Sequence, residues 1–297
     1  MKVFYHNDTD GRCAGAVIYH YINSFTEVIL VESNFFEMEY SKPFPLDIVK
    51  PNETVYILDF HVQDDDEFRQ LQRITKNIIL IDHHKTTLQH REEHPELYEN
   101  LKLCVLDVNH SGCWLTWEYV TDDYLVMTGN DWPEVPMAIK LIDDMDRWVW
   151  QYPGTKGFTV GLKLYPHQPW DEVWTELFGK HQWSLISRIA VDGETCAKFD
   201  DMVMNDYCNK YGWETEFEGH KAFAQGQYRG GSTAFGKRIT EYPLCLSYEF
   251  LGDKWIVGLY SETIDVSEIA AKYGGGGHKG ASGFVCRELP FRKTGDE

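Results

Sequence analysis

Short apolar runs alternate with amphipathic segments along the first half of the chain. The apolar runs occupy residues 2–6, 27–33, 54–60 and 77–84. Between them, segments 11–23 and 63–76 repeat apolar residues at the three- and four-residue spacing of a helix face. Strands that alternate with helices predict an α/β domain with a mostly parallel sheet flanked by helices. Continuous apolar strands are typical of a sheet that is covered on both faces.

The pattern changes after residue 182. Residues 183–211 predict one long helix, and we interpret it as a connector between two domains. Beyond it, strands are predicted at 244–250, 255–261 and 283–288, and a helix at 265–273. Two further helices are expected earlier in the chain, within 107–120 and 136–150. We therefore predict a first domain over 1–182, a helical connector over 183–212, and a smaller α/β domain over 213–297.

The composition limits the classes of partner. The chain of 297 residues has no apolar run near the roughly 20 residues of a membrane span, and no signal-peptide pattern at its start. Its seven scattered cysteines include no Cys-x-x-Cys pair, so we expect reduced thiols and a cytoplasmic location. The net charge of −19 disfavours long duplex nucleic acid. A short anionic substrate remains compatible with it, because bound cations can dominate the field of a site.

Ligand-type residues follow the predicted strands. The stretch "HNDTDG" places His6, Asp8 and Asp10 at alternate positions, so an extended backbone would point them the same way. Like-charged groups this close repel unless a cation lies between them, and a divalent metal is the obvious candidate. Asp59 in "LDFHV" also ends a predicted strand, where parallel sheets gather their ligands. The alternative for each is an ordinary polar turn.

Three further stretches carry candidate chemistry. In "IDHHKT" the adjacent His83 and His84 diverge, so one can bind metal while the other faces substrate. In "LIDDMDRW" the acids at 143, 144 and 146 offer a further carboxylate. In "GGGGHKGASG" (274–283), exposed backbone N–H groups could hold an anion. The alternatives are a surface histidine pair, a solvated helix end and a flexible linker.

Taken together, these stretches resemble a known family. "HNDTDG", "LDFHV", "IDHHKT" and "LIDDMDRW" are similar, in order, to the four metal-binding motifs of the DHH phosphoesterases. "GGGGHKGASGF" resembles the signature of the DHH-associated C-terminal domain, which distinguishes the chain from family II inorganic pyrophosphatases. "HSGCWLTWEY" (110–119) and "DRW" (146–148) resemble the oligoribonuclease, or nano-RNase, branch.

The resemblance implies roles for individual residues and a cofactor. It implies two ions, Mn²⁺ or Mg²⁺, held by His6, Asp8, Asp10, Asp59, His83, Asp144 and Asp146. Asp59 corresponds to the aspartate that bridges the metals, and Asp144 ranks ahead of Asp146 as the ligand of motif four. The implied catalytic residues are Asp59, His83 and His84. The implied substrate-binding residues are His84, Ser111, Gly275, Gly276, Gly277 and His278. Tyr260 occupies a position where many relatives have an arginine.

The resemblance also implies an activity. We expect a two-metal phosphodiesterase that hydrolyses short oligoribonucleotides to mononucleotides. Two alternatives stay within the enzyme class, a 3′-phosphoadenosine 5′-phosphate phosphatase and a cyclic-dinucleotide phosphodiesterase. A third is a non-catalytic nucleotide-binding sensor. The expected partner is short RNA or a nucleotide, without a membrane. The direction of degradation, the length limit and the oligomeric state, including a homodimer, stay open.

Overall fold

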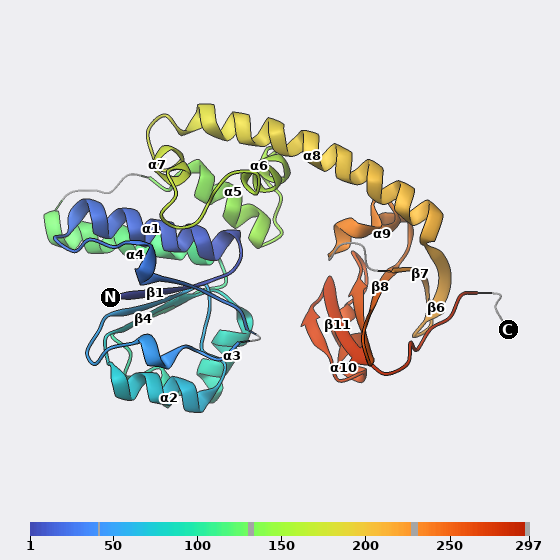
Figure 1. Cartoon of the computed structure of the whole chain (residues 1–297), viewed down its shortest axis with the longest axis horizontal. Coiled ribbons are helices and arrows are strands. Elements are labelled where there is room, and N and C mark those ends of the chain that lie inside the picture. The colour runs from blue at the N-terminus through green and yellow to red at the C-terminus, as the bar shows by residue number, and fades with distance from the viewer. Residues whose placement is uncertain (41, 130–133, 227–230, 295–297) are drawn as a thin grey trace. The chain divides into compact units, whose positions relative to one another are not determined.

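The computed structural model divides into two compact units, Met1–Thr195 and Cys196–Glu297 (Figure 1). It describes residues 1–40, 42–129, 134–226 and 231–294. The boundary between the units falls within one helix, α8 (Gln182–Tyr211). The predicted connector therefore corresponds to a helix that contributes residues to both units.

The first unit contains a five-stranded sheet in the order β2-β1-β3-β4-β5. Its strands are β1 (Lys2–His6), β2 (Phe35–Met38), β3 (Val55–Leu58), β4 (Ile78–Asp82) and β5 (Leu103–Leu106). All four neighbouring pairs are parallel. The predicted α/β fold with a parallel sheet is confirmed.

Helices cover both faces of this sheet, which explains the continuous apolar strands. Alternate residues of β1 enter different cores: Val3 and Tyr5 pack in one cluster, whereas Phe4 packs in the other. In Figure 1, α1 (Thr9–Phe25) and α4 (Gly112–Thr128) lie on one face and α2 (Asp65–Ile74) on the other. The same unit also contains α3 (Lys85–Glu93), α5 (Met137–Asp146), α6 (Thr155–Leu162), α7 (Val173–Leu177) and the part of α8 up to Thr195.

The second strand was predicted at the wrong place. The segment 27–33 is apolar in sequence, yet Val28, Ile29 and Val31 are exposed, and only Leu30 is buried. The strand is instead β2, which pairs with β1. The four residues of β2 include the buried Phe35 and Met38, so apolar character alone did not distinguish this strand from the exposed apolar run before it.

Two elements of the first unit have sequences that give little signal. The strand β5 at the sheet edge is only half-buried along its length. Helix α3 is polar, and Thr87 is its one buried residue. Helix α3 lacks the apolar periodicity from which helices are predicted, and the apolar run of β5 is only four residues long.

The second unit is built on a six-stranded sheet in the order β10-β11-β9-β8-β7-β6. Its strands are β6 (Trp213–Phe217), β7 (His220–Gly226), β8 (Leu244–Leu251), β9 (Lys254–Tyr260), β10 (Gly276–His278) and β11 (Ala281–Cys286). Among the described strands of this sheet, β7 and β8 pair in parallel and the other neighbours are antiparallel. Helices α9 (Arg238–Glu241) and α10 (Val266–Lys272) complete the unit, so the smaller α/β domain is also confirmed.

Local sequence signals set the ends of α10. The Asp265 side chain accepts a hydrogen bond from the backbone N–H of Ser267, as an N-cap does. Gly274 follows the helix at φ +74°, the left-handed conformation that ends helices. No helix in the described part of the chain is both long and apolar enough to cross a membrane.

Candidate metal centre

The candidate residues meet at the carboxyl ends of three neighbouring strands of the first unit. His6 is the last residue of β1, Asp59 follows β3, and Asp82 ends β4. Because these strands are parallel neighbours, their carboxyl ends lie along one edge of the sheet. The sequence prediction that ligand-type residues gather at this edge agrees with the structure.

The first motif reaches the site in a different way from the one expected. The strand ends at His6, Asp8 is the N-cap of α1, and Asp10 lies in the first helical turn, so the three do not share one extended face. Asp8 accepts a hydrogen bond from the N–H of Gly11 at 2.8 Å. Its other oxygen lies 2.7 Å from His6 Nδ1. A Cβ on Gly11 would lie 2.3 Å from the His6 carbonyl oxygen, so this turn requires glycine.

Asp10 is fixed by the start of another helix. Its carboxylate accepts hydrogen bonds from the Ser111 hydroxyl at 2.8 Å and from the backbone N–H groups of Gly112 at 2.6 Å and Cys113 at 3.0 Å. Asp10 thus caps the N-terminus of α4 from outside that helix. Ser111 is fully buried and its hydroxyl donates to Asp10, so in this structure Ser111 positions that carboxylate, and the substrate contact expected of Ser111 stays a prediction.

Asp59 is the clearest sign that a cation belongs here. Its side chain is fully buried, and neither carboxylate oxygen has a hydrogen-bond partner in the described part of the chain. Burial and the charges of Asp10 and Asp8 raise the pKa of Asp59 well above its usual value. An ionised carboxylate in this position is costly unless a positive charge accompanies it.

The backbone around Asp59 is specialised. Asp59 has φ +55°, a left-handed conformation that aspartate and asparagine tolerate better than most residues. A Cβ on Gly112 would lie 2.6 Å from the Asp59 Cβ and 2.9 Å from its Oδ1. Glycine at 112 therefore allows the carboxylate to lie against the start of α4.

His83 lies close to three of the candidate carboxylates. Its Nε2 lies 3.1 Å from Asp59 Oδ1, 3.2 Å from Asp146 Oδ2 and 3.8 Å from Asp10 Oδ2. The side chains around Asp59 form three sets, and within each set the ligand atoms all lie within 4.8 Å of one another. The sets are His6, Asp8 and Asp59; Asp10, His83 and Asp146; and Asp59, His83 and His84. Asp59 belongs to two of these sets, as a carboxylate shared by two ions would.

The structure brings Asp146, and not Asp144, to this cluster. Asp144 is fully buried and accepts hydrogen bonds from the backbone N–H groups of Gln151 at 2.7 Å and Tyr152 at 3.2 Å, and from the Thr155 hydroxyl. Its carboxylate is used to hold the segment after α5. Our preference for Asp144 over Asp146 is therefore reversed.

The neighbouring acid Asp143 also has an internal role. It accepts hydrogen bonds from the backbone N–H of Ser111 at 2.7 Å and from the Arg147 guanidinium at 3.1 Å. Asp143 therefore secures the same α4 entry that carries the partners of Asp10.

The second histidine of the pair is oriented by Asp82. The Asp82 Oδ1 lies 2.7 Å from His84 Nδ1, and its Oδ2 accepts a hydrogen bond from the Thr87 hydroxyl at 2.5 Å. Burial opposes protonation of His84, but the Asp82 carboxylate outweighs it and raises the His84 pKa. The sequence prediction missed this role of Asp82 and Thr87, although the residue before a histidine pair is a natural place to look for such a partner.

One family model matches the N-terminal part of the chain. Residues 1–139 match the model of the DHH family, N-terminal domain. Asp82, His83 and His84 form the Asp-His-His triplet, the DHH triplet below. An uncharacterised protein of Acanthamoeba polyphaga mimivirus is 23% identical over 241 residues, which are 76% of this chain and 53% of that protein. The chain thus spans about half the length of this relative.

Two solved structures share the fold. One is the DHH domain of a member of the s1p family of ribosomal proteins, with a TM-score of 0.59 and 15% identity over 96% of this chain and 82% of that one. The other is exonuclease RecJ bound to manganese, with a TM-score of 0.52 and 11% identity over 96% of this chain and 85% of that one. At these identities the similarity concerns the fold.

The glycine run of the second unit is more ordered than a free loop. Gly276 and Gly277 belong to strand β10, which pairs antiparallel with β11. The N–H of Gly275 donates to the Ala270 carbonyl at 3.0 Å, so this donor is not free for an anion. The side chain of His278 lies outside the described part of the chain. The Tyr260 hydroxyl accepts a hydrogen bond from the N–H of Gly231 at 3.2 Å.

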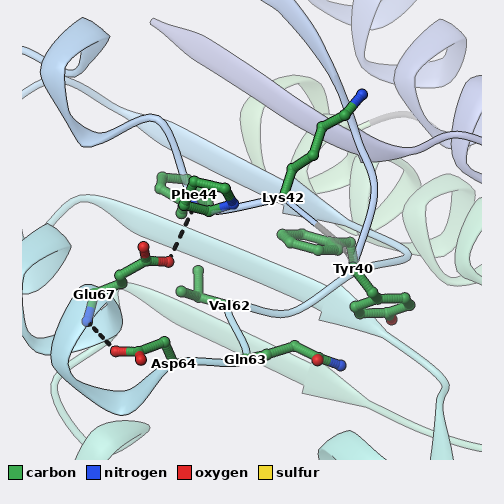
Figure 2. A pocket seen from close by; sticks show the side chains of 9 residues that line it. Tyr40, Lys42, Phe44, Val62, Gln63, Asp64 and Glu67 are labelled. Carbon is green, nitrogen blue, oxygen red and sulfur yellow. Dashed lines mark hydrogen bonds between the residues drawn. The ribbon is translucent and has the colours of Figure 1, made fainter. Parts of the chain in front are cut away.

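The first unit also contains a cavity of about 270 Å³, whose lining side chains are drawn in Figure 2. Its walls are the segments 42–44 and 62–64 together with Tyr40, Phe60 and Glu67. Figure 2 shows that Glu67 joins the two segments, because its carboxylate accepts from the Phe44 N–H at 2.9 Å and its own N–H donates to Asp64.

Tyr40 connects this cavity to the candidate metal centre. Its ring centroid lies 5.2 Å from that of His6 and 6.1 Å from that of His84. Its buried hydroxyl has no hydrogen-bond partner among the described residues. Sequence reasoning missed Tyr40, because nothing in the segment before Lys42 distinguishes this tyrosine from a core residue.

Proposed function

We propose that the first unit hydrolyses phosphoester bonds in short oligoribonucleotides with the aid of two divalent ions. The observation that carries the proposal is Asp59, a buried carboxylate without a hydrogen-bond partner in the described part of the chain, shared between two sets of ligand atoms. Buried charges in proteins are paired or bind metals. The match of residues 1–139 to the DHH family supports the same class of chemistry.

The residues at the site fit a pair of hard divalent cations. His6 and Asp8 would serve one ion, Asp10, His83 and Asp146 the other, and Asp59 both. Carboxylates and imidazoles suit Mn²⁺, and the RecJ structure with the same fold contains manganese. Such ions lower the pKa of bound water and stabilise a leaving oxygen. Four carboxylates roughly balance two divalent charges, so the filled site would no longer repel phosphate.

The remaining residues position the reacting groups. Asp82 accepts a hydrogen bond from His84 Nδ1, which leaves Nε2 for the substrate. With its pKa raised, His84 can donate a proton at Nε2 to a phosphate oxygen or to the leaving oxygen. The hydroxyl of Tyr40 can donate a further hydrogen bond there. The aromatic walls of the neighbouring cavity, among them Phe44 and Phe60, suit a nucleobase.

The proposed substrate is short because the protein is acidic. The net charge of −19 repels every nucleotide that lies outside the metal centre. A substrate of a few nucleotides places most of its phosphates near the ions. We also propose that the second unit binds the substrate through Gly276, Gly277 and His278, and that the protein acts in the cytoplasm.

Two substrate classes remain as alternatives, 3′-phosphoadenosine 5′-phosphate and cyclic dinucleotides. Each carries a phosphoester that the same metal centre could cleave. A non-catalytic nucleotide sensor is disfavoured by the complete ligand set around Asp59.

One panel of substrates tests the proposal. The full chain is incubated with Mn²⁺ and end-labelled RNAs of about two to twenty nucleotides, 3′-phosphoadenosine 5′-phosphate, and a cyclic dinucleotide. We expect turnover of the shortest RNAs, loss of it with EDTA, and loss of at least a hundredfold in Asp59→Asn. The exposed Asp47→Asn is the matched control. Absence of hydrolysis of every substrate by protein shown to bind Mn²⁺ would refute an enzymatic role and favour the sensor.

A further inference from the structure

A second group of metal-ligand side chains lies outside the candidate metal centre. Asp65, His90 and His94 each offer a ligand atom, and these atoms all lie within 4.8 Å of one another. None of the three belongs to the sets around Asp59, and no sequence motif discussed above includes them. The group joins the start of α2 to the end of α3.

The helices bring these residues together by ordinary periodicity. Asp65 is the first residue of α2, whereas His90 lies in the last turn of α3 and His94 is the C-cap of that helix. The N–H of His94 donates to the His90 carbonyl at 2.8 Å, so the two residues lie one turn apart, and both imidazoles lie near Asp65. Their ring centroids are 4.8 Å apart.

The distances are those of a nearly assembled site. His90 Nε2 lies 2.9 Å from Asp65 Oδ1, and His94 Nδ1 lies 3.8 Å from Asp65 Oδ2. Ligands about 2.0–2.1 Å from a tetrahedral ion are about 3.3 Å apart, between these two values. Small rotations of the side chains would therefore admit an ion.

A buried tyrosine fixes the orientation of the His90 ring. Its other ring nitrogen, Nδ1, lies 2.7 Å from the hydroxyl of Tyr98, which is 5% exposed. Metal-binding histidines characteristically use their second nitrogen in this way, which fixes the tautomer and the ring plane. The Asp65 and His94 side chains are 34% and 41% exposed, so an ion can reach the group from solvent.

One cation of the protein already lies near the group. Arg69 Nη2 is 3.8 Å from Asp65 Oδ2, but it is closer to Glu96, at 3.1 Å. The guanidinium therefore has a nearer partner, and a metal bound to Asp65 would not leave Arg69 unpaired.

Helix α3 has little apolar packing to hold it against the rest of the first unit. It directly follows the DHH triplet, and Thr87 is its one buried residue, so apolar packing contributes little to its stability. An ion held by Asp65, His90 and His94 would fasten the far end of α3 to α2.

We infer that Asp65, His90 and His94 form a structural site for a zinc-class divalent ion, separate from the candidate metal centre. Two imidazoles and one carboxylate, with water as fourth ligand, form a familiar tetrahedral Zn²⁺ set. The inference does not depend on the proposed function.

The test measures metal stoichiometry in the full chain. The background variant Asp59→Asn/Asp146→Asn weakens the candidate metal centre, and Co²⁺ or Zn²⁺ is then titrated by calorimetry and visible absorption. We expect one tetrahedral Co²⁺ equivalent, which disappears or weakens at least tenfold when His90→Ala and His94→Ala are added. The exposed His181→Ala is the matched control and should leave this equivalent unchanged.

A milder variant guards against misfolding. The single change His94→Gln alters an exposed side chain and should weaken Co²⁺ binding while the far-ultraviolet circular dichroism stays unchanged. Zn²⁺ should also raise the melting temperature of the background variant and not that of the variant lacking both histidines. Equal Co²⁺ stoichiometry, affinity and spectrum with and without His90 and His94 would overturn the inference.

Discussion

Replacing Asp59 by asparagine should stabilise the metal-free protein and abolish its response to metal. Asparagine has nearly the same shape and tolerates the φ of +55° at this position. The change therefore removes a charge with little effect on packing. It therefore measures separately how the carboxylate lowers the free energy of unfolding without metal and how it raises that free energy when metal is bound.

The magnitude follows from the surroundings of Asp59. The side chain is fully buried, and both oxygens lack hydrogen-bond partners among the described residues. A buried unsatisfied group costs about 1–3 kcal/mol, and more when charged. Asparagine keeps unpartnered polar atoms in this position but carries no charge, so it should recover only the part of the cost that is due to the charge, about 1.4 kcal/mol of the free energy of unfolding for each pKa unit by which the surroundings raise the pKa of Asp59. Each kcal/mol corresponds to about 2–4 °C in melting temperature for a unit of this size.

Thermal unfolding with and without Mn²⁺ is the assay. In EDTA, Asp59→Asn should melt above the wild type. With free Mn²⁺ at about 100 times its dissociation constant, the wild type should gain about 2.7 kcal/mol per site, and the variant much less. The order of the two melting temperatures should then reverse.

The pH dependence provides a second check. Burial and nearby carboxylates raise the pKa of Asp59 in the folded state. The folded state then binds the proton more tightly than the unfolded one, so this group lowers stability as pH rises above about 4, its pKa in the unfolded chain. The advantage of the variant in EDTA should be absent below about pH 4 and grow as pH rises from there towards the raised pKa of Asp59. A variant that melts below the wild type in EDTA at neutral pH would refute this reasoning.

Two further substitutions and one comparison of substrates test the site. Gly112→Ala should reduce Mn²⁺-dependent hydrolysis by at least a hundredfold, because its Cβ would lie 2.6 Å from the Asp59 Cβ, whereas Gly154→Ala, with open space around the new Cβ, should not. Asp82→Asn should slow turnover about 10²- to 10⁴-fold through His84 while calorimetry shows Mn²⁺ affinity reduced far less; equal losses in both would contradict the separate role of His84. RNA of about twenty nucleotides should be hydrolysed much more slowly than a dinucleotide at low salt, and the difference should narrow above ~0.15 M salt; equal rates at low salt would contradict the charge argument.

The sequence predicted those parts of the fold that burial determines. Strands β1, β3 and β4 are covered on both faces, so their residues had to be apolar and the runs were visible. Helix α3 was missed because polar contacts hold it, and such contacts leave no periodic signal. The run at 27–33 was misassigned because its apolar residues are largely exposed.

The candidate site could be located from the sequence but not resolved into roles. Strand ends identified where ligands would gather. The choice between Asp144 and Asp146 depends on what lies opposite each carboxylate: the Thr155 hydroxyl for one and His83 for the other. Those partners are distant in sequence, so spacing alone could not decide. The same limit applies to Ser111, whose hydroxyl faces Asp10 from about a hundred residues away.

The cap that Asp10 provides for α4 has a consequence for how metal leaves the protein. Three donors draw electron density from this carboxylate, whereas Asp8 accepts one backbone hydrogen bond, from Gly11, beside its contact with the proposed ligand His6, so Asp10 is the poorer metal ligand of the two. The ion beside Asp10 should therefore exchange with solvent faster than the ion beside Asp8. A protein purified without added metal would then retain one ion more readily than two, and its activity would depend on the free Mn²⁺ concentration around it.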